Sequence, residues 1–175
     1  KINHDLVRPQ TVIQSGIIGK RVSSFVKKQS AVLEIPASQW ESYLGTQPHS
    51  EYPSASALLC RATLEHAEVA AKYKLGSGSA TVPFNLSVSA STFPEVIRRT
   101  FGLPSDSSPV NVYFESLSAM AENCGTSRLW AGVHFRPSVE VGLSLGEGIG
   151  QAAFDHVRHL VRGQVPPNCI RCRIA

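Results

Sequence analysis

The sequence predicts an all-α fold, in which a helical bundle is connected by long loops. Three segments carry apolar residues at the spacing of one helix face, and they cover residues 54–75, 110–123 and 137–162. The stretches between them are rich in Ser, Thr, Gly and Pro, which is typical of loops. A chain of 175 residues is long enough to bury one substantial core. We therefore expect one helical domain over residues 1–162, followed by a Pro- and Cys-containing tail over residues 163–175.

The N-terminal quarter is expected to contain helices and one extended segment. Residues 1–8 fit the last turns of a helix that stops at Pro9, because a residue before proline avoids the helical region. Apolar residues recur at helical intervals over residues 13–26 and predict a further helix. Residues 31–36 are predicted to be extended. Residues 38–44 begin with a Ser-x-x-Glu pattern, which predicts a short capped helix.

The central part of the chain alternates helices with loops. Two glycines are expected to end the helix of residues 54–75. The segment 76–92 is rich in Ser, Thr and Gly, which favours a loop over the short hairpin that the alternation in residues 82–88 would allow. A proline opens a predicted short helix over residues 94–101.

Two amphipathic segments follow. The apolar pattern of residues 110–123 predicts a helix that ends at Gly125. A final helix is expected to run without a break from residue 137 to about residue 162. Small residues spaced four apart on this helix allow another helix to approach closely, and they are Gly142, Gly146 and Gly150.

The overall charge suits a small anionic ligand. The formal net charge is +4 and the isoelectric point is about 9.0. Nucleic-acid binding is not expected, because it needs a basic stripe with interleaved aromatic residues, whereas the lysine pair 27–28 and the arginine pair 98–99 are isolated. A membrane span is not expected either, because no apolar run approaches ~18 residues.

The cysteines leave their pairing open. Cys169 and Cys172 have CxxC spacing, but they lack the strand–helix setting of a redox motif, and no second CxxC exists to complete a zinc site. Cys60 and Cys124 are compatible with disulfide bonding and also with buried thiols. The even cysteine count and the glycosylation sequon at Asn85 favour a secreted or extracellular setting.

The most informative stretch contains an arginine and a histidine six residues apart, Arg128 and His134. In a continuous helix, six residues turn the chain by about 600°, so the two side chains would point about 120° apart. They can meet at one ligand only if the chain bends between them. Gly125 and Gly132 provide the possible bends. Taken alone, the stretch favours a helix-capping arginine beside a buried histidine.

Two further motifs favour a shared site. Lys1 and Arg8 are separated by two helical turns and precede a proline, and Pro53-Ser54 stands before the helix of residues 54–75. The ordered set Lys-x6-Arg-Pro, Pro-Ser-x-x and Ser-Arg-x5-His resembles the signature of the vanadium-dependent haloperoxidases and the type 2 phosphatidic acid phosphatases. The resemblance extends from residue 1 to about residue 161, and it implies a helical bundle of the haloperoxidase/acid phosphatase type.

The resemblance implies a binding site for vanadate, or for phosphate in its place. Three cations would neutralise the equatorial oxygens, as a nearly trianionic group in a partly dehydrated cleft requires, and these are Lys1, Arg8 and Arg128. Ser54 would contribute its hydroxyl, and Ala55 its backbone N–H, at a helix N-terminus that itself attracts anions. His134 would be the axial ligand of the vanadium, or the nucleophile of a phosphatase.

Two positions depart from the family pattern. The second motif normally ends in a histidine that exchanges protons, and here that position is Ser56. Serine cannot exchange a proton near neutral pH, and general acid–base help is typically worth ~10²–10⁴ in rate. Phosphatases also place an orienting acid four residues after the axial histidine, where this chain has Ser138. Glu140 and His49 are the candidates to compensate.

The leading hypothesis is a haloperoxidase-like protein that uses bound vanadate, hydrogen peroxide and a halide, with catalysis weakened at Ser56. The second is a non-catalytic relative that keeps the fold for assembly or oxyanion binding, and the third is a phosphatase without a membrane span. Because Lys1 would need preceding helical turns, we also expect a missing N-terminal segment, a second chain or a second copy to complete the bundle, across the glycine ridge or residues 1–26.

Overall fold

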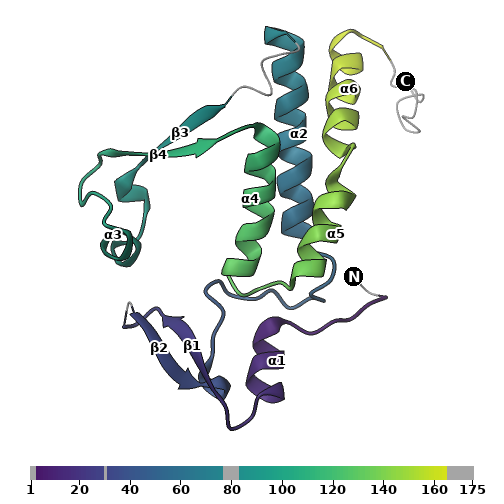
Figure 1. Ribbon diagram of the computed structural model, residues 1–175. Helices are drawn as coiled ribbons and strands as arrows, with labels where there is room; N and C mark the ends of the chain where they lie inside the picture. The colour runs from purple at the N-terminus through teal and green to yellow at the C-terminus, as the bar shows by residue number, and fades with distance from the viewer. Residues whose placement is uncertain (1–2, 30, 77–82, 165–175) are drawn as a thin grey trace.

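Helix α2 (Ala55–Leu75) lies at the centre of the structure, a computed structural model that describes residues 3–29, 31–76 and 83–164 (Figure 1). It packs against three further helices, which are α4 (Leu117–Trp130), α5 (Arg136–Gly146) and α6 (Ile149–Val161). The side chains buried between these helices are mainly small, including Ala57, Ala62, Ala121 and Val139. The helical bundle that the sequence predicts is therefore present, with α2 as its common partner.

The fold is not purely α-helical. Strands β1 (Arg21–Val26) and β2 (Ala31–Pro36) form one antiparallel pair, and strands β3 (Phe84–Ser89) and β4 (Pro109–Phe114) form another. Both pairs project to the same side of the helices, with α3 (Glu95–Phe101) beyond the second pair (Figure 1). The all-α prediction is correct for the helical bundle and wrong for these two antiparallel strand pairs.

The glycine ridge faces α2, as the four-residue spacing predicts. A Cβ at Gly142 would lie 2.4 Å from the carbonyl oxygen of Ser54, and one at Gly146 would lie 2.6 Å from that of Leu58. At Gly150 the nearest atom would be the backbone nitrogen of His66, at 2.4 Å. The ridge is therefore covered by α2 from within the chain, so a further segment or second copy would pack elsewhere, and that partner stays a prediction.

The last predicted helix is in fact two helices. Gly148 adopts φ +78° between α5 and α6, a left-handed conformation that breaks the helix. The carboxylate of Glu65 on α2 accepts hydrogen bonds from the backbone N–H groups of Gly148, at 3.0 Å, and Gly150, at 2.9 Å. These bonds supply partners for free N–H groups at the start of α6, which makes the break favourable.

The first predicted helices are wrong in their placement. Arg8 has an extended backbone and caps α1 (Pro9–Gly16), so Pro9 begins a helix that it was expected to terminate. Proline suits a first helical position because its missing N–H is not needed there. The helix expected over residues 13–26 stops at Gly16, and its second half is β1, paired with the extended segment correctly predicted at residues 31–36.

Strand pairing also overturns two central predictions. Residues 84–89 form β3 where we expected mainly a loop, and residues 109–114 form β4 where we expected the start of a helix. The two strands are far apart in sequence, so neither segment alone reveals its partner. Helix α4 then begins after Ser116, whose hydroxyl oxygen accepts from the N–H of Ala119 at 3.0 Å.

Other element boundaries are closer to expectation. Helices α2 and α3 match their predicted ranges. The short helix expected over residues 38–44 is reduced to a 3-10 turn, η1 (Ala37–Gln39), and a second such turn, η3 (Ala90–Thr92), follows β3. Helix α4 continues through Gly125, where the side chain of Leu143 packs too closely to leave room for a Cβ.

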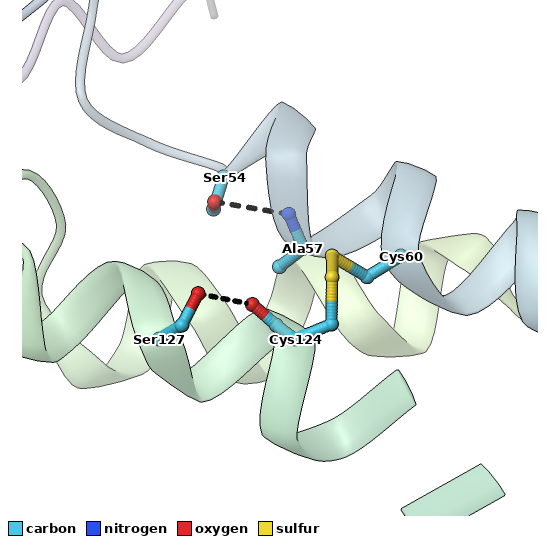
Figure 2. Close-up of a disulfide and its surroundings, with 5 residues drawn as sticks. All are labelled: Ser54, Ala57, Cys60, Cys124 and Ser127. Carbon is cyan, nitrogen blue, oxygen red and sulfur yellow. Dashed lines mark hydrogen bonds between the residues drawn. A yellow bond between two sulfur atoms is a disulfide. The ribbon is translucent and has the colours of Figure 1, made fainter. Parts of the chain in front are cut away.

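A disulfide between Cys60 and Cys124 joins α2 to α4 (Figure 2), with the two Cα atoms 5.8 Å apart. The sequence alone left this choice open. Cys169 and Cys172 lie outside the described residues. Among the described helices, none is long and apolar enough to cross a membrane.

Candidate oxyanion-binding site

The chain bends between Arg128 and His134, as a shared site requires. Helix α4 ends at Trp130, Gly132 takes φ +70°, and α5 begins only at Arg136. The bend therefore occurs at Gly132 and not at Gly125. Both side chains consequently line one cavity, on the side of the bundle from which the loop before α2 departs.

That cavity brings together side chains from all three sequence motifs. Its lining residues are Arg8, Gly45, Thr46, Gln47, His49, Ala55, Ser56, Arg128, Val133 and His134. Its volume is about 50 Å³. Since a cavity needs about 10–15 Å³ to hold one water, the space suits a small ligand of a few non-hydrogen atoms, such as an oxyanion.

His134 presents one ring nitrogen to the cavity and the other to a buried carboxylate. Its Nδ1 lies 2.9 Å from Oε1 of Glu51, and Glu51 is only 2% exposed. Its Nε2 lies 3.2 Å from Nη1 of Arg8. Since a carboxylate accepts and a guanidinium donates, Nδ1 carries the proton and Nε2 offers a lone pair. A histidine in this state is a metal ligand or a nucleophile.

Glu51 is the functional residue that sequence analysis missed. Its Oε1 also accepts from the backbone N–H of Phe135 at 2.9 Å. The sequence places Ser138 at the position of the orienting acid and offers Glu140 as a nearby substitute. Ser138 lies 3.4 Å from Nδ1 of His134, and its hydroxyl donates to the backbone oxygen of Glu51 at 3.1 Å, whereas Glu140 lines a different pocket. Glu51 stands three residues before Ser54, but its local sequence does not reveal its role, because His134 is 83 residues away.

Arg8 crosses the cavity from the first motif. Its Nη1 donates to the backbone oxygen of Val133 at 2.8 Å, and its Nη2 lies 3.0 Å from Nδ1 of His49. Burial lowers the pKa of Arg8, the Glu51 carboxylate raises it, and the nearby Arg128 lowers it. Arginine nevertheless stays protonated at physiological pH. Arg8 and Arg128 thus bring two fixed positive charges close together.

Both arginines retain buried donor capacity that an anion would satisfy. The Nε atoms of Arg8 and Arg128 are buried without a hydrogen-bond partner among the described residues. Ala55, the first residue of α2, lines the same cavity, so the positive end of that helix dipole faces the space between the arginines. Two cations, a helix N-terminus and a histidine lone pair form a suitable environment for an oxyanion.

The remaining predicted residues lie partly inside and partly outside the cavity. Ser54 is fully buried and caps α2, with its hydroxyl oxygen accepting from the N–H of Ala57 at 3.3 Å (Figure 2), and it does not line the cavity. Its direct contact with an oxyanion stays a prediction. Ser56 does line the cavity, as does His49. Lys1 lies outside the described residues.

Comparison with known proteins places this geometry in a family. The family model of the VCPO second helical-bundle domain matches residues 1–163. The chain belongs to this family. A search of curated protein sequences gives no match.

Two solved structures are similar to this second helical-bundle domain. A holo-type bacterial vanadium-dependent chloroperoxidase matches at 28% identity and a TM-score of 0.67, over 90% of this chain and 31% of that one. An apo-type bacterial vanadium-dependent chloroperoxidase matches at 28% identity and a TM-score of 0.69, over 92% of this chain and 32% of that one. The domain therefore spans about a third of the length of these chloroperoxidases. The superfamily predicted from the motifs is confirmed.

The cavity can be compared with the needs of a bare metal ion and of an oxyanion. No group of three or more His, Cys, Asp or Glu side chains that could hold a bare metal ion occurs in the described part of the chain. An oxyanion of a metal makes a different demand, because its oxygens need cationic donors and its metal centre needs a single nitrogen. Arg8, Arg128 and His134 supply these groups, so the site fits vanadate or phosphate.

Proposed function

We propose that this domain provides the vanadate site of a vanadium-dependent haloperoxidase. The observation that supports this most strongly is the state of His134, whose Nε2 lone pair faces a cavity lined by two arginines while its Nδ1 is held by Glu51. The similarity to vanadium-dependent chloroperoxidases supports the choice of vanadate over other oxyanions.

Each residue has a definite role in this proposal. Arg8 and Arg128 neutralise the oxyanion, and the N-terminus of α2 at Ala55 donates a backbone N–H. His134 holds the metal centre through Nε2, and Lys1 supplies a third cation. Bound vanadate would act as a Lewis acid that activates hydrogen peroxide for halide oxidation. To bind it, the Arg8 guanidinium must exchange its contact with His134 for contacts with the oxyanion.

Proton exchange is the step in which this site departs from the family pattern. Ser56 lines the cavity at the position of the usual histidine, and its hydroxyl has no pKa near neutrality. We therefore propose that halide oxidation is slow. We propose that His49 replaces part of the missing function, since its imidazole lines the cavity and contacts the same Arg8 that would hold the oxyanion.

Phosphatase activity is the second candidate, and Glu51 is the observation that favours it. The phosphatase pattern lacks its orienting acid at Ser138, but the Glu51 carboxylate occupies that role in space. A phosphate monoester would then meet His134 as a nucleophile, although without an acid for the leaving group at Ser56. A non-catalytic role in assembly or oxyanion storage is the remaining alternative, and only turnover measurements separate it from the first two.

The surroundings of the domain are also proposed. Several apolar side chains remain exposed on the helices: Leu59, Leu145, Ile149, Val157, Leu160 and Val161. We propose that a further helical segment of the same protein, or a second copy, covers them. The Cys60–Cys124 disulfide supports a secreted or extracellular setting.

The decisive experiment is a titration of the purified protein with orthovanadate, followed by ⁵¹V NMR. We expect binding that Arg128→Ala weakens by at least tenfold, because a hydrogen bond to a charged group is worth about 1.5–3 kcal/mol. The matched control is Arg99→Ala, since Arg99 is 79% exposed on α3 in an i,i+4 pair with Glu95. Equal affinity in both variants, or no binding to the unaltered protein, would refute the proposed site.

A peroxide assay completes the test. Vanadate-loaded protein, hydrogen peroxide and bromide should brominate a phenol-type indicator, whereas p-nitrophenyl phosphate hydrolysis without vanadate would favour the phosphatase. Vanadate binding with neither activity would leave the non-catalytic role.

A further inference from the structure

We infer that Glu51 is the positioning residue of His134, holding its Nδ1 proton so that the Nε2 lone pair faces the oxyanion cavity. The inference rests on the proposed function and deepens it, because it assigns the orienting acid to a residue upstream of the second motif. The family pattern would place that acid after His134, at the position of Ser138.

The side-chain geometry supports a strong interaction. Glu51 and His134 are 2% and 6% exposed, and their Oε1 and Nδ1 atoms are 2.9 Å apart. The same Oε1 accepts the backbone N–H of Phe135 at 2.9 Å. A carboxylate that accepts from two adjacent residues fixes both the ring and the start of α5. Hydrogen bonds that involve an ionised partner are roughly twice as strong as neutral ones.

The backbone of Glu51 links the same elements a second time. Its N–H donates to the carbonyl of Leu6 at 2.9 Å, two residues before Arg8. Its carbonyl accepts from the hydroxyl of Ser138 at 3.1 Å. Ser138 in turn accepts, through its backbone oxygen, from the N–H of Ser54 at 3.0 Å. Residue 51 therefore connects the segment that leads to Arg8, the residues just before helix α2, and helix α5.

Ser138 itself is a weaker candidate for the orienting group. Its hydroxyl oxygen lies 3.4 Å from Nδ1, beyond the usual N–H···O range, so it is a poor acceptor of the Nδ1 proton, and its own proton is donated to the carbonyl of Glu51 at 3.1 Å. Arg8 favours the same tautomer from the other side of the ring, because it donates to Nε2. That contact is lost when Arg8 binds an oxyanion, so only the Glu51 side of the ring keeps its support throughout.

A charged orienting partner has a chemical consequence. A carboxylate behind an imidazole raises the basicity of the nitrogen that binds the metal, and loss of such a partner typically costs about 10–100-fold in affinity or activity. The negative charge of Glu51 is tolerable beside an anion site because Arg8 and Arg128 lie on the cavity side. The Glu51 carboxylate also offsets part of the lowering of the Arg8 pKa that burial causes.

The test compares Glu51→Gln and Glu51→Ala with the unaltered protein. Glutamine has nearly the same shape and can still accept from His134 and Phe135, so it removes the charge and keeps the geometry. Alanine removes both. The matched control is Glu140→Gln, which changes an exposed carboxylate on α5 that lines a separate pocket.

Two measurements are made on each protein, with thermal unfolding as the check on folding. The first is the ¹H–¹⁵N resonance of the His134 Nδ1 proton in the oxyanion-free protein, which a charge-assisted hydrogen bond shifts downfield. The second is the dissociation constant for orthovanadate and, separately, for inorganic phosphate. We expect the downfield shift of the Nδ1 proton to become smaller in Glu51→Gln and to vanish in Glu51→Ala. The affinity for each oxyanion should fall about 10-fold in Glu51→Gln and up to about 100-fold in Glu51→Ala.

The outcomes separate this inference from the proposed function. A downfield Nδ1 signal that persists in Glu51→Ala, or unchanged affinity in a folded Glu51→Ala or Glu51→Gln variant, overturns the role of Glu51. If Glu51→Ala does not fold, Glu51→Gln still decides, because a purely structural role predicts an unchanged Nδ1 signal in that variant. If the unaltered protein binds neither vanadate nor phosphate, the proposed function fails, while the Nδ1 signal still tests the Glu51–His134 bond.

Discussion

Replacing Gly142 by alanine tests whether helix packing sets the geometry of the cavity. A Cβ at this position would lie 2.4 Å from the carbonyl oxygen of Ser54 and 3.0 Å from the Cβ of Ala57. The first of these is a backbone atom and cannot rotate away. Restoring an ordinary contact requires the N-terminus of α2 to move by about 1 Å away from α5. That movement would carry Ala55 and Ser56 away from His134.

The expected change in stability combines two terms. Overpacking a helix interface costs about 1–3 kcal/mol, and exchanging glycine for alanine within a helix recovers about 1 kcal/mol. We therefore expect a net loss of roughly 0–2 kcal/mol, and a Tm lowered by up to about 8 °C for a domain of this size. A displacement of about 1 Å at a site can cost up to about 10²-fold in function. We expect the effect of Gly142→Ala on vanadate affinity to exceed its effect on stability.

The assay pairs thermal unfolding with vanadate titration and includes two controls. At Gly16 the nearest atom to an added Cβ is 3.8 Å away, so Gly16→Ala should leave both quantities nearly unchanged. At Gly125 the clash is with the movable end of Leu143, at 2.8 Å, so Gly125→Ala should be intermediate. The reasoning is refuted if Gly142→Ala binds vanadate as tightly as Gly16→Ala does.

Two further predictions concern the disulfide and Ser56. Replacing Cys60 and Cys124 together by serine should lower the free energy of unfolding by about 2–5 kcal/mol, because the disulfide closes a loop with a sequence separation of 64. Urea denaturation measures this change, and unchanged stability would mean that the disulfide does not form in solution. Replacing Ser56 by histidine should raise peroxide-dependent bromination by about tenfold or more at equal vanadate occupancy, within the range for a placed acid or base. If His49→Ala in the unaltered background abolishes bromination, then His49 already performs the proton transfer and the Ser56 substitution should add little.

The sequence predicted best the features that depend on neighbouring residues. The range of α2, the extended segment at residues 31–36 and the glycine ridge all follow from local spacing, and the structure confirms them. Convergence of Arg128 and His134 was predictable because glycine is the residue that permits a bend within so short a segment. Membership of the superfamily followed from three ordered motifs, although each motif alone is weak.

The errors share a different physical origin. Strands β1, β3 and β4 gain their stability from partners elsewhere in the chain, so their own residues do not identify them. Pro9 was misread because proline both ends one helix and begins another, and the choice depends on flanking structure. Glu51 was missed because its partner, His134, is 83 residues away, and only the fold brings the two together.

The placement of the two strand pairs has a consequence for how relatives of this domain can be found. The segments β1–β2 and β3–α3–β4 lie between successive motifs and project to one side of the bundle (Figure 1). Loop closure becomes only slightly more costly as a connection lengthens, so insertions in these excursions would change the sequence distance between motifs without moving the cavity. Searches for distant members should therefore fix the order of the three motifs and leave the intervals between them free. An acidic residue three positions before the serine of the Pro-Ser motif would then be a further criterion, and it does not depend on the intervals between motifs.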